Sequence, residues 1–209
     1  MNQELEKNKY FVERNVLSKE ILQLCSHYYY MKFIINKEFT KDIYSLTESV
    51  FDENGNFQRN SDVVRPFSVF DYSDTLSESI LVELLPRMKE ITGIPELFPT
   101  YSFARFYENG QYLVKHKDRP SCQYSITLPV ASFDETPWSI YVENNAVDLK
   151  MGDIVVYKGC EALHWREPFE GTWQVQLHLH YVDSSNPEYV DFIRDRRPSI
   201  GLKPIGVRI

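Results

Sequence analysis

From Pro99 onward, the hydrophobic residues of the chain recur at every second position in a series of short runs. A period of two is typical of β-strands, whose successive side chains point to opposite faces of a sheet. Turn signals such as Asn109-Gly110 and Met151-Gly152-Asp153 separate the runs. The predicted strands are Tyr101–Tyr107, Gln111–Lys115, Gln123–Pro129, Trp138–Val142, Ile154–Tyr157 and Gln174–Val182. So many short strands predict a two-sheet jelly roll or a partly open barrel.

The first part of the chain carries a helical pattern. After a short strand expected at Tyr10–Leu17, Ser18 is the expected N-cap of a helix over residues 18–36. Apolar residues recur along this helix at helical spacing and predict a buried, aromatic-rich face. The residues of that face are Ile21, Leu22, Cys25, Tyr28, Tyr29 and Phe33. This pattern indicates a helix that packs on a sheet.

A second helix is predicted over residues 75–92, with Asp74 or Ser77 as its cap. Its apolar residues, three or four positions apart, are Ile80, Leu81, Leu84, Leu85, Met88 and Ile91. Pro86 lies inside this pattern and predicts a kink or two shorter pieces, because proline cannot donate a backbone hydrogen bond.

The 209 residues fit one domain with a single core. We expect a mainly β fold with flanking helices, that is, a double-stranded β-helix (jelly roll) with an N-terminal helical layer. Residues 1–98 would form the helical support layer and loops, residues 99–182 the jelly-roll core, and residues 183–209 a C-terminal tail.

Composition narrows the class of function. A net charge of −7 argues against a general nucleic-acid or anionic-membrane surface, so neither partner is expected. The cysteines Cys25, Cys122 and Cys160 are widely spaced and form no CxxC pair, which excludes a disulfide framework and a zinc ribbon. The polar start carries no signal-peptide core, and no apolar run approaches the ~18 residues of a membrane span. A cytoplasmic protein is expected.

A histidine and an aspartate, His116 and Asp118, stand two positions apart at the end of a predicted strand. Side chains at this spacing share one face, so imidazole and carboxylate can converge on a metal ion. His164 begins another strand 46 residues after Asp118 (164 − 118), far enough for several strands to intervene. His178 and His180 are alternatives, but they lie in the middle of a strand, and His164 is favoured. Two histidines and one carboxylate on one face of an ion are typical of non-haem Fe(II) oxygenases.

Three sequence segments together resemble one family. They are the run from Arg105 to Tyr112, the His116-Lys117-Asp118 motif, and the run from Gly152 to Tyr157 that precedes His164 and Pro168. In order and spacing they resemble the Fe(II)- and 2-oxoglutarate-dependent oxygenase superfamily, nearest to its prolyl-hydroxylase-like branch. The resemblance covers the region from Pro99 to Tyr181.

The resemblance implies that His116, Asp118 and His164 bind Fe(II), with 2-oxoglutarate and O₂ at the remaining positions. It implies a reaction that hydroxylates a small molecule or an amino-acid side chain and releases succinate and CO₂. A carboxylate at Asp118 favours hydroxylation, since halogenating relatives have a small residue there.

Relatives usually supply an Arg or Lys downstream of the second histidine to bind the far carboxylate of 2-oxoglutarate. Residues 171–176, where that cation would fall, contain none. We expect Arg166 to take this role, because arginine suits bidentate binding of a carboxylate. Its alternative is a surface ion pair with Glu167 or Glu170.

Two further residues are expected at the cosubstrate. Tyr107 matches by position the tyrosine that binds 2-oxoglutarate in relatives. Gln174 belongs to the polar face of the last strand, which also carries Gln176 and His178. That face would line the cosubstrate pocket if it points into the barrel, or meet solvent if it points outward.

Arg119 and Arg105 are alternatives to Arg166 for the far carboxylate, and otherwise they are the basic residues expected to bind substrate. The loops at 36–66 and 131–137 would shape the substrate pocket. Other hypotheses are a cupin-like iron oxygenase that does not use 2-oxoglutarate, a non-catalytic jelly-roll binding module, and a zinc hydrolase, because the same ligands suit Zn²⁺. The oligomeric state and the identity of the substrate are left open by the sequence.

Overall fold

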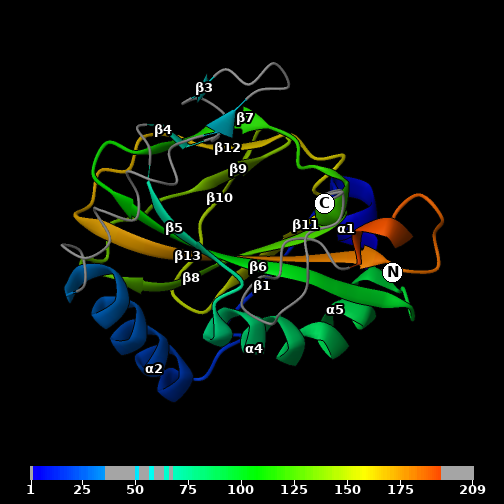
Figure 1. Ribbon diagram of the computed structural model, residues 1–209, viewed down its shortest axis with the longest axis horizontal. Coiled ribbons are helices and arrows are strands. Elements are labelled where there is room, and N and C mark those ends of the chain that lie inside the picture. Colours follow the sequence, from blue (N-terminus) through cyan, green and yellow to red (C-terminus); the bar gives the residue numbers. More distant parts are fainter. Residues whose placement is uncertain (1, 36–49, 52–56, 59–63, 66–67, 194–209) are drawn as a thin grey trace.

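The computed structural model describes residues 2–35, 50–51, 57–58, 64–65 and 68–193 (Figure 1). The α-helices are α1 (Gln3–Asn8), α2 (Lys19–Tyr29), α4 (Thr75–Glu83) and α5 (Leu85–Thr92); the other helical turns are a π-helical turn, η1 (Tyr30–Ile35), and two 3₁₀ turns, η2 (Pro120–Cys122) and η3 (Val190–Phe192). The strands are β1 (Tyr10–Glu13), β2 (Val50–Phe51), β3 (Phe57–Gln58), β4 (Val64–Arg65), β5 (Val69–Tyr72), β6 (Leu97–Glu108), β7 (Tyr112–His116), β8 (Tyr124–Ser132), β9 (Ile140–Val142), β10 (Asn145–Val147), β11 (Ile154–Tyr157), β12 (His164–Arg166) and β13 (Trp173–Asp183). The chain is mainly β with helices, as predicted.

Two antiparallel sheets dominate the described residues. One has six strands in the order β1-β11-β8-β13-β6-β5, and the other has five in the order β10-β9-β12-β7-β4. From β6 to β13 the chain passes back and forth between them: β6, β8, β11 and β13 lie in the larger sheet, and β7, β9, β10 and β12 in the smaller. In Figure 1 the smaller sheet lies above the larger one, and α2, α4 and α5 lie below it.

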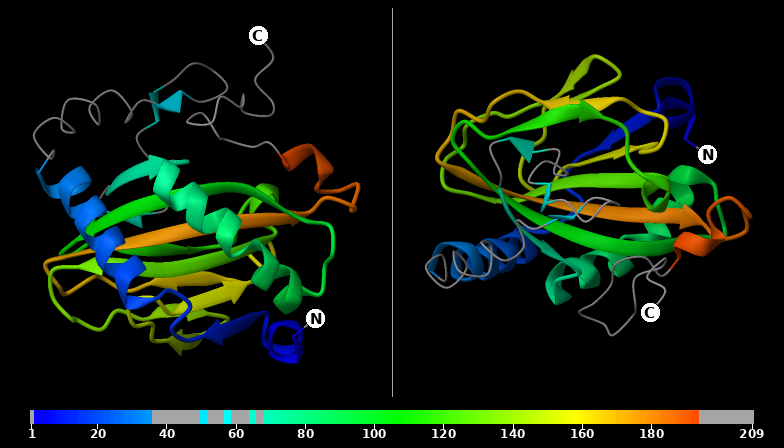
Figure 2. Two further views of the ribbon diagram at one scale, coloured as in Figure 1. Left: turned by 90° about the horizontal axis from the view of Figure 1, so that it is seen from below. Right: turned by 45° about the horizontal axis from the view of Figure 1, so that its top comes forward.

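The main core lies between these helices and the six-stranded sheet. In the left view of Figure 2, seen from below, α2, α4 and α5 lie across this face of the sheet. Cys25 and Tyr29 of α2 and Leu81 and Met88 of the following helices are buried against the sheet. Burial of such side chains contributes about 1.5–3 kcal/mol each for the larger apolar ones. The helical layer therefore covers one face of the larger sheet and leaves its other face toward the smaller sheet.

The residues of strand β13 show which face of the larger sheet packs against the helices and which faces the smaller sheet. Its apolar residues belong to the core shared with the helices: Trp173, Val175, Leu177, Leu179 and Tyr181. Its polar residues alternate with them and are also buried: Gln174, Gln176, His178 and His180. Because alternate side chains point to opposite faces, the polar set lies in the space between the two sheets. Of the two orientations left open by the sequence, the inward one is found.

The helix signals were largely correct. Ser18 caps α2, accepting a hydrogen bond from the backbone N–H of Ile21. Asp74, not Ser77, caps α4, and the Pro86 signal corresponds to two pieces, since α4 ends and α5 begins on either side of Leu84. The predicted burial of Ile21 is wrong: its side chain is 40% exposed, because the buried face of α2 passes through Cys25 and Tyr29.

The predicted strand at Tyr10–Leu17 ends early, at Glu13, because Asn15 adopts a left-handed backbone conformation with φ of 56°. Strands β5, β10 and β12 have no counterpart among the predicted strands, although His164 was placed at a strand start, as it is. The predicted loop at 36–66 lies largely outside the described residues, as does the tail from residue 194. No described helix has the length and apolarity needed to cross a membrane.

Candidate metal centre

Two neighbouring strands of the smaller sheet bring the two histidines together. His116 ends β7 and lies directly opposite His164, the first residue of β12. Two positions later Arg166 lies opposite Leu113, so β7 carries one more residue than β12 between these pairs. Such a bulge redirects side chains locally, and bulges are common beside active sites. The two imidazole rings lie 4.3 Å apart, measured between centroids.

Each histidine is held in the same way by its own backbone. Nδ1 of His116 lies 2.6 Å from the carbonyl oxygen of Val114, and Nδ1 of His164 lies 3.0 Å from that of Ala162. A carbonyl oxygen only accepts, so each Nδ1 carries the proton and each Nε2 keeps its lone pair. An imidazole fixed through its other nitrogen in this way is typical of metal-ligating histidines.

Asp118 completes the group. Its Oδ1 lies 3.6 Å from Nε2 of His116 and 3.5 Å from Nε2 of His164. Adjacent ligand atoms of a metal with bonds of about 2.1 Å are roughly 3.0–3.4 Å apart, so a small inward movement of these three atoms would complete coordination of one ion. The chemistry of the donor set, two neutral imidazoles and a carboxylate, fits Fe(II). The three predicted ligands are thus brought together.

The charges at this centre favour an ionised carboxylate. Burial alone would raise the pKa of Asp118, but the interactions of its carboxylate with His116 and His164 outweigh burial and hold the pKa well below the ordinary value. Burial alone would lower the pKa of His164, and Asp118 outweighs this and raises it. The carboxylate is therefore ready to bind a cation at neutral pH.

Asp118 is also close to Cys122 and His180, which together with it form a second group of potential ligands. The thiol of Cys122 is buried, and burial raises its pKa, so the thiolate that a metal requires is disfavoured. Nδ1 of His180 is already hydrogen-bonded to Ser125. The first group is the better metal site.

Arg166 lies on the same face of β12 as His164 and is almost completely buried, with 1% of its surface exposed. One terminal nitrogen donates to the carbonyl oxygen of Trp138 at 2.7 Å, whereas Nε and the other terminal nitrogen, Nη2, have no hydrogen-bond partner within the described part of the chain. Burial lowers the pKa of Arg166 to about 10, so it remains charged at neutral pH. No carboxylate pairs with it among the described residues, and the alternative of a surface ion pair is not found.

The two other predicted cosubstrate residues lie beside this arginine. The guanidinium of Arg166 lies 4.4 Å from the centre of the Trp138 ring, and Tyr107 contacts the same ring edge to face at 4.7 Å. Gln174 lies opposite Tyr107 on the neighbouring strand and is paired through its side-chain amide with Gln176. Arg166, Tyr107 and Gln174 thus gather at one end of the space between the sheets.

Of the predicted substrate residues, Arg105 lies on β6 two positions before Tyr107, and Arg119 lies in the segment after β7. Arg105 is buried, donates to the hydroxyl of Ser68 at 2.7 Å, and lies 4.7 Å from the ring centre of Phe103. Arg119 follows Asp118 directly, and its guanidinium lies 4.9 Å from the ring centre of Tyr101. Phe103 and Tyr101 oppose His178 and His180 on β13, so these two rings face the same interior as the metal centre.

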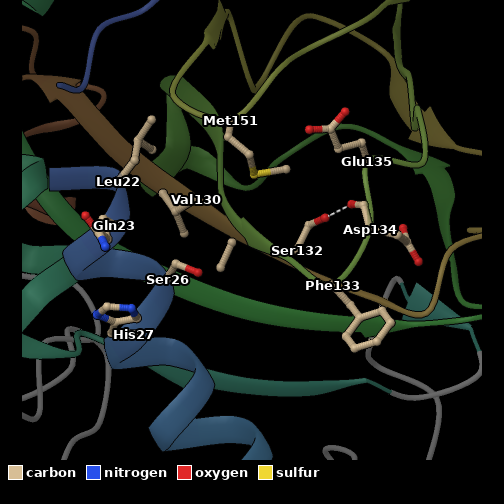
Figure 3. A pocket seen from close by; sticks show the side chains of 11 residues that line it. Leu22, Gln23, Ser26, His27, Val130, Ser132, Phe133, Asp134, Glu135 and Met151 are labelled. Carbon is tan, nitrogen blue, oxygen red and sulfur yellow. Dashed lines mark hydrogen bonds between the residues drawn. The ribbon is translucent and has the colours of Figure 1, made fainter. Parts of the chain in front are cut away.

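The loop at 131–137 was expected to shape the substrate pocket. Five of its residues, Ala131 to Glu135, line a hollow of about 440 Å³ between α2 and the end of β8 (Figure 3). Leu22 and His27 of α2 form the opposite side of it. None of the three candidate ligands lines this hollow, so it is separate from the metal centre.

Sequence reasoning missed two residues that contact Asp118. Ser125 donates to Oδ2 of Asp118 at 2.9 Å, and Gly159 accepts the backbone N–H of Asp118 at 2.9 Å. Ser125 lies on β8 and Gly159 lies in the loop after β11, so no local sequence pattern links either residue to Asp118.

Comparison with known proteins bears on the fold. No protein-family model matches the sequence, and no curated protein is similar to it in sequence. Solved structures do match. The non-haem alpha ketoglutarate dependent epimerase SnoN from nogalamycin biosynthesis has a TM-score of 0.60 at 12% identity, over 96% of this chain and 89% of SnoN.

Two prolyl hydroxylases are similar to the same extent. The enzyme from Trichoplax adhaerens, in complex with a hypoxia inducible factor peptide fragment, has a TM-score of 0.58 at 13% identity, over 90% of this chain and 88% of that one. The prolyl-4-hydroxylase of Pseudomonas putida has a TM-score of 0.55 at 13% identity, over 85% and 94%. The chain therefore has the fold of prolyl hydroxylases and of enzymes that depend on alpha ketoglutarate, which is 2-oxoglutarate, as its resemblance predicted.

Proposed function

We propose that the protein is a non-haem Fe(II)- and 2-oxoglutarate-dependent dioxygenase that hydroxylates a small molecule or an amino-acid side chain. One observation carries the proposal. The group formed by His116, Asp118 and His164 faces the same interior as Arg166, a buried cation with unsatisfied N–H groups. Leaving such donors buried without a partner costs about 1–3 kcal/mol, which is consistent with a ligand that satisfies them.

The path of the chain supports a jelly roll as the framework for this chemistry. Apart from the paired β9 and β10, successive strands from β6 to β13 alternate between two facing sheets, which is the strand arrangement of a double-stranded β-helix. The metal ligands come from the smaller sheet and the loop after β7, and the polar residues of β13 face them from the larger sheet.

In this proposal each residue has a stated task. His116, Asp118 and His164 hold the iron and leave its other positions open. Arg166 binds the far carboxylate of 2-oxoglutarate, with Gln174 and Tyr107 beside it. Iron, 2-oxoglutarate and O₂ together supply the oxidation of a substrate C–H bond, with release of succinate and CO₂. A water-poor interior between the sheets protects the reaction from side reactions.

Arg119 and Arg105 are proposed to orient the substrate along the wall that Tyr101 and Phe103 form. Both arginines lie beside aromatic rings that face the interior. In the structures it resembles, the bound molecules differ: a peptide fragment in the Trichoplax enzyme, and nogalamycin RO in a SnoN complex that also holds Fe³⁺ and alpha ketoglutarate. The proposed substrate class therefore includes both small molecules and amino-acid side chains.

The test is an anaerobic titration of the metal-free protein with Fe(II), then with 2-oxoglutarate, followed by measurement of succinate in air. We expect one iron per chain, 2-oxoglutarate binding that requires the metal, and slow succinate release without substrate. Iron binding with no 2-oxoglutarate binding or turnover would instead indicate the cupin-like oxygenase. A protein that binds no metal would be the non-catalytic module, and one that hydrolyses only with Zn²⁺ would be the hydrolase.

Single substitutions test the ligands. His116→Ala and Asp118→Ala should each lose iron while circular dichroism shows a retained fold, because each removes one of three ligands. His27→Ala is the matched control, since His27 lies on α2 and outside the metal centre. Stoichiometric iron in either ligand variant would contradict the assignment.

A further inference from the structure

The two carboxylate oxygens of Asp118 have different surroundings. Oδ1 faces Nε2 of both His116 and His164, at 3.6 and 3.5 Å. Oδ2 points the other way and accepts a hydrogen bond from the hydroxyl of Ser125 at 2.9 Å. Only one oxygen of the carboxylate is therefore directed at the metal position.

Ser125 is itself held in place by a histidine. It is fully buried on β8, directly opposite His180 on β13, and its Oγ lies 2.9 Å from Nδ1 of that histidine. A serine hydroxyl has one proton, and the charged Oδ2 of Asp118 at 2.9 Å is a nearer acceptor for it than the carbonyl oxygen of Cys122 at 3.3 Å. The contact with His180 then requires Nδ1–H of the imidazole to donate to Ser125. His180 thus fixes the direction of the Ser125 hydroxyl.

Gly159 provides the space in which Oδ2 lies. The backbone N–H of Asp118 donates to the carbonyl oxygen of Gly159 at 2.9 Å. A Cβ atom at position 159 would lie 2.5 Å from Oδ2 of Asp118 and 2.2 Å from the carbonyl oxygen of Cys122. Both distances are far below van der Waals contact, so any side chain here would displace the carboxylate or the backbone beside it.

We propose that Ser125, directed by His180 and accommodated by Gly159, is a positioning residue that makes Asp118 a one-oxygen ligand of the metal. A carboxylate can bind a metal through one oxygen or through both. With one oxygen from Asp118 and two imidazoles, a six-coordinate ion keeps three open positions, whereas a second oxygen would take one of them. This inference rests on the proposed function, because those positions are the ones 2-oxoglutarate and O₂ would occupy.

The experiment compares Ser125→Ala, Ser125→Thr and the wild-type protein by anaerobic titration with Fe(II), and by the absorption spectrum of the Co(II)-loaded protein. Ser125→Ala should bind Fe(II) about 10–100 times more weakly, as expected when a hydrogen bond to a metal ligand is lost. Its Co(II) spectrum should change, because the carboxylate is free to rotate. Ser125→Thr keeps the hydroxyl and should restore both properties.

Thr127→Ala is the matched control. Thr127 is the next inward-facing residue of β8, is equally buried, and contacts Nδ1 of His178 at 3.2 Å in the same manner. It does not contact Asp118, so its variant should bind Fe(II) within about twofold of the wild type. A second pair, His180→Asn and His180→Leu, keeps or removes the donor to Ser125 and should follow Ser125→Thr and Ser125→Ala respectively.

The possible outcomes distinguish the positioning role of Ser125 from the proposed function. If wild type and Ser125→Ala bind Fe(II) equally well with the same Co(II) spectrum, the positioning role is wrong, while the proposed function stands. If the wild type binds Fe(II) but not 2-oxoglutarate, the proposed function fails, and the comparison of metal affinities still decides the role of Ser125. If the wild type binds no metal, both are wrong.

Discussion

The guanidinium of Arg166 lies 4.4 Å from the ring centre of Trp138 and donates to the carbonyl oxygen of the same residue. Trp138 thus provides both a ring face and a hydrogen-bond acceptor for Arg166, whose Nε and Nη2 have no hydrogen-bond partner among the residues that the structure describes. A charge buried in this way destabilises a fold unless a ligand compensates for it.

Arg166→Met should therefore stabilise the ligand-free protein while removing its affinity for 2-oxoglutarate. Replacing the buried charge by an apolar side chain of similar length should add about 1–3 kcal/mol to the free energy of unfolding. At about 2–4 °C per kcal/mol for a chain of this size, the melting temperature should rise measurably. The dissociation constant for 2-oxoglutarate should increase roughly 30-fold or more, because loss of a charged partner costs about 2–5 kcal/mol.

The control for this prediction is Arg166→Lys, which keeps the charge but loses the two-pronged donor. It should bind 2-oxoglutarate with intermediate affinity and should not gain stability. Iron affinity should be unchanged in both variants. An Arg166→Met protein that binds 2-oxoglutarate as tightly as the wild type would show that another residue holds the far carboxylate.

Alanine substitution at two glycines with left-handed backbone conformations should distinguish the stability cost of backbone strain from that of a steric clash. Gly152 has φ of 84°, and a Cβ there would lie 2.8 Å from Cδ1 of Leu22 on α2. Gly110 has φ of 80° with nothing within 4 Å of a Cβ. Gly110→Ala should cost only the backbone strain, about 1 kcal/mol, whereas Gly152→Ala should cost more because the side chain of Leu22 must also shift. Chemical denaturation of both variants measures the difference, and equal losses would mean that the Leu22 side chain shifts without cost.

A buried carboxylate joins α2 to α4 and predicts an acid-sensitive interaction. Asp74 accepts hydrogen bonds from the hydroxyls of Tyr28 and Tyr29, and Lys32 lies 3.3 Å from it. Burial alone would raise the pKa of Asp74, but the two hydroxyls and the lysine outweigh burial and lower it. Asp74→Asn should lower the free energy of unfolding by about 2 kcal/mol at pH 7.

The pH dependence has a definite sign. The folded-state pKa of Asp74 lies below the unfolded value of about 3.9, so the ionised carboxylate stabilises the fold above that value. The contribution is lost as pH falls from about 4 through the folded pKa, where both states bind the proton. The difference between the wild type and Asp74→Asn, measured by denaturation from pH 7 to pH 3, should therefore shrink in acid. A difference that stays constant would contradict an ionic role.

The sequence was informative where periodicity is long and unambiguous. The helical spacing after Ser18 and Asp74 and the alternation in β13 each corresponded to an element, and Pro86 marked a real interruption. The short strand β10, of three residues, escaped prediction because so few residues carry no period. The alternation of apolar and polar residues along β13 also does not show which way its polar face points, because the packing of the apolar face against α2 decides the orientation.

Some residues of the candidate site could likewise be recognised from the sequence, and others could not. The His116 and Asp118 pair and the strand-start His164 could be recognised because spacing and order carry the signal. Ser125 and Gly159 could not, because their contacts with Asp118 depend on how β8 and the loop after β11 approach the end of β7. The burial of Arg166 depends equally on the arrival of Trp138 from a different segment.

The pairing of His164 with His116 across β12 and β7 has a mechanical consequence. An ion shared by Asp118 and His164 ties together two points 46 residues apart (164 − 118) and closes a loop that contains β8 to β11. It is thus a reversible cross-link, comparable to a disulfide in restricting the unfolded chain but removable by a chelator. Iron supply would then set the lifetime of the folded protein as well as its activity, and protease digestion of chelated and iron-loaded samples would display the difference.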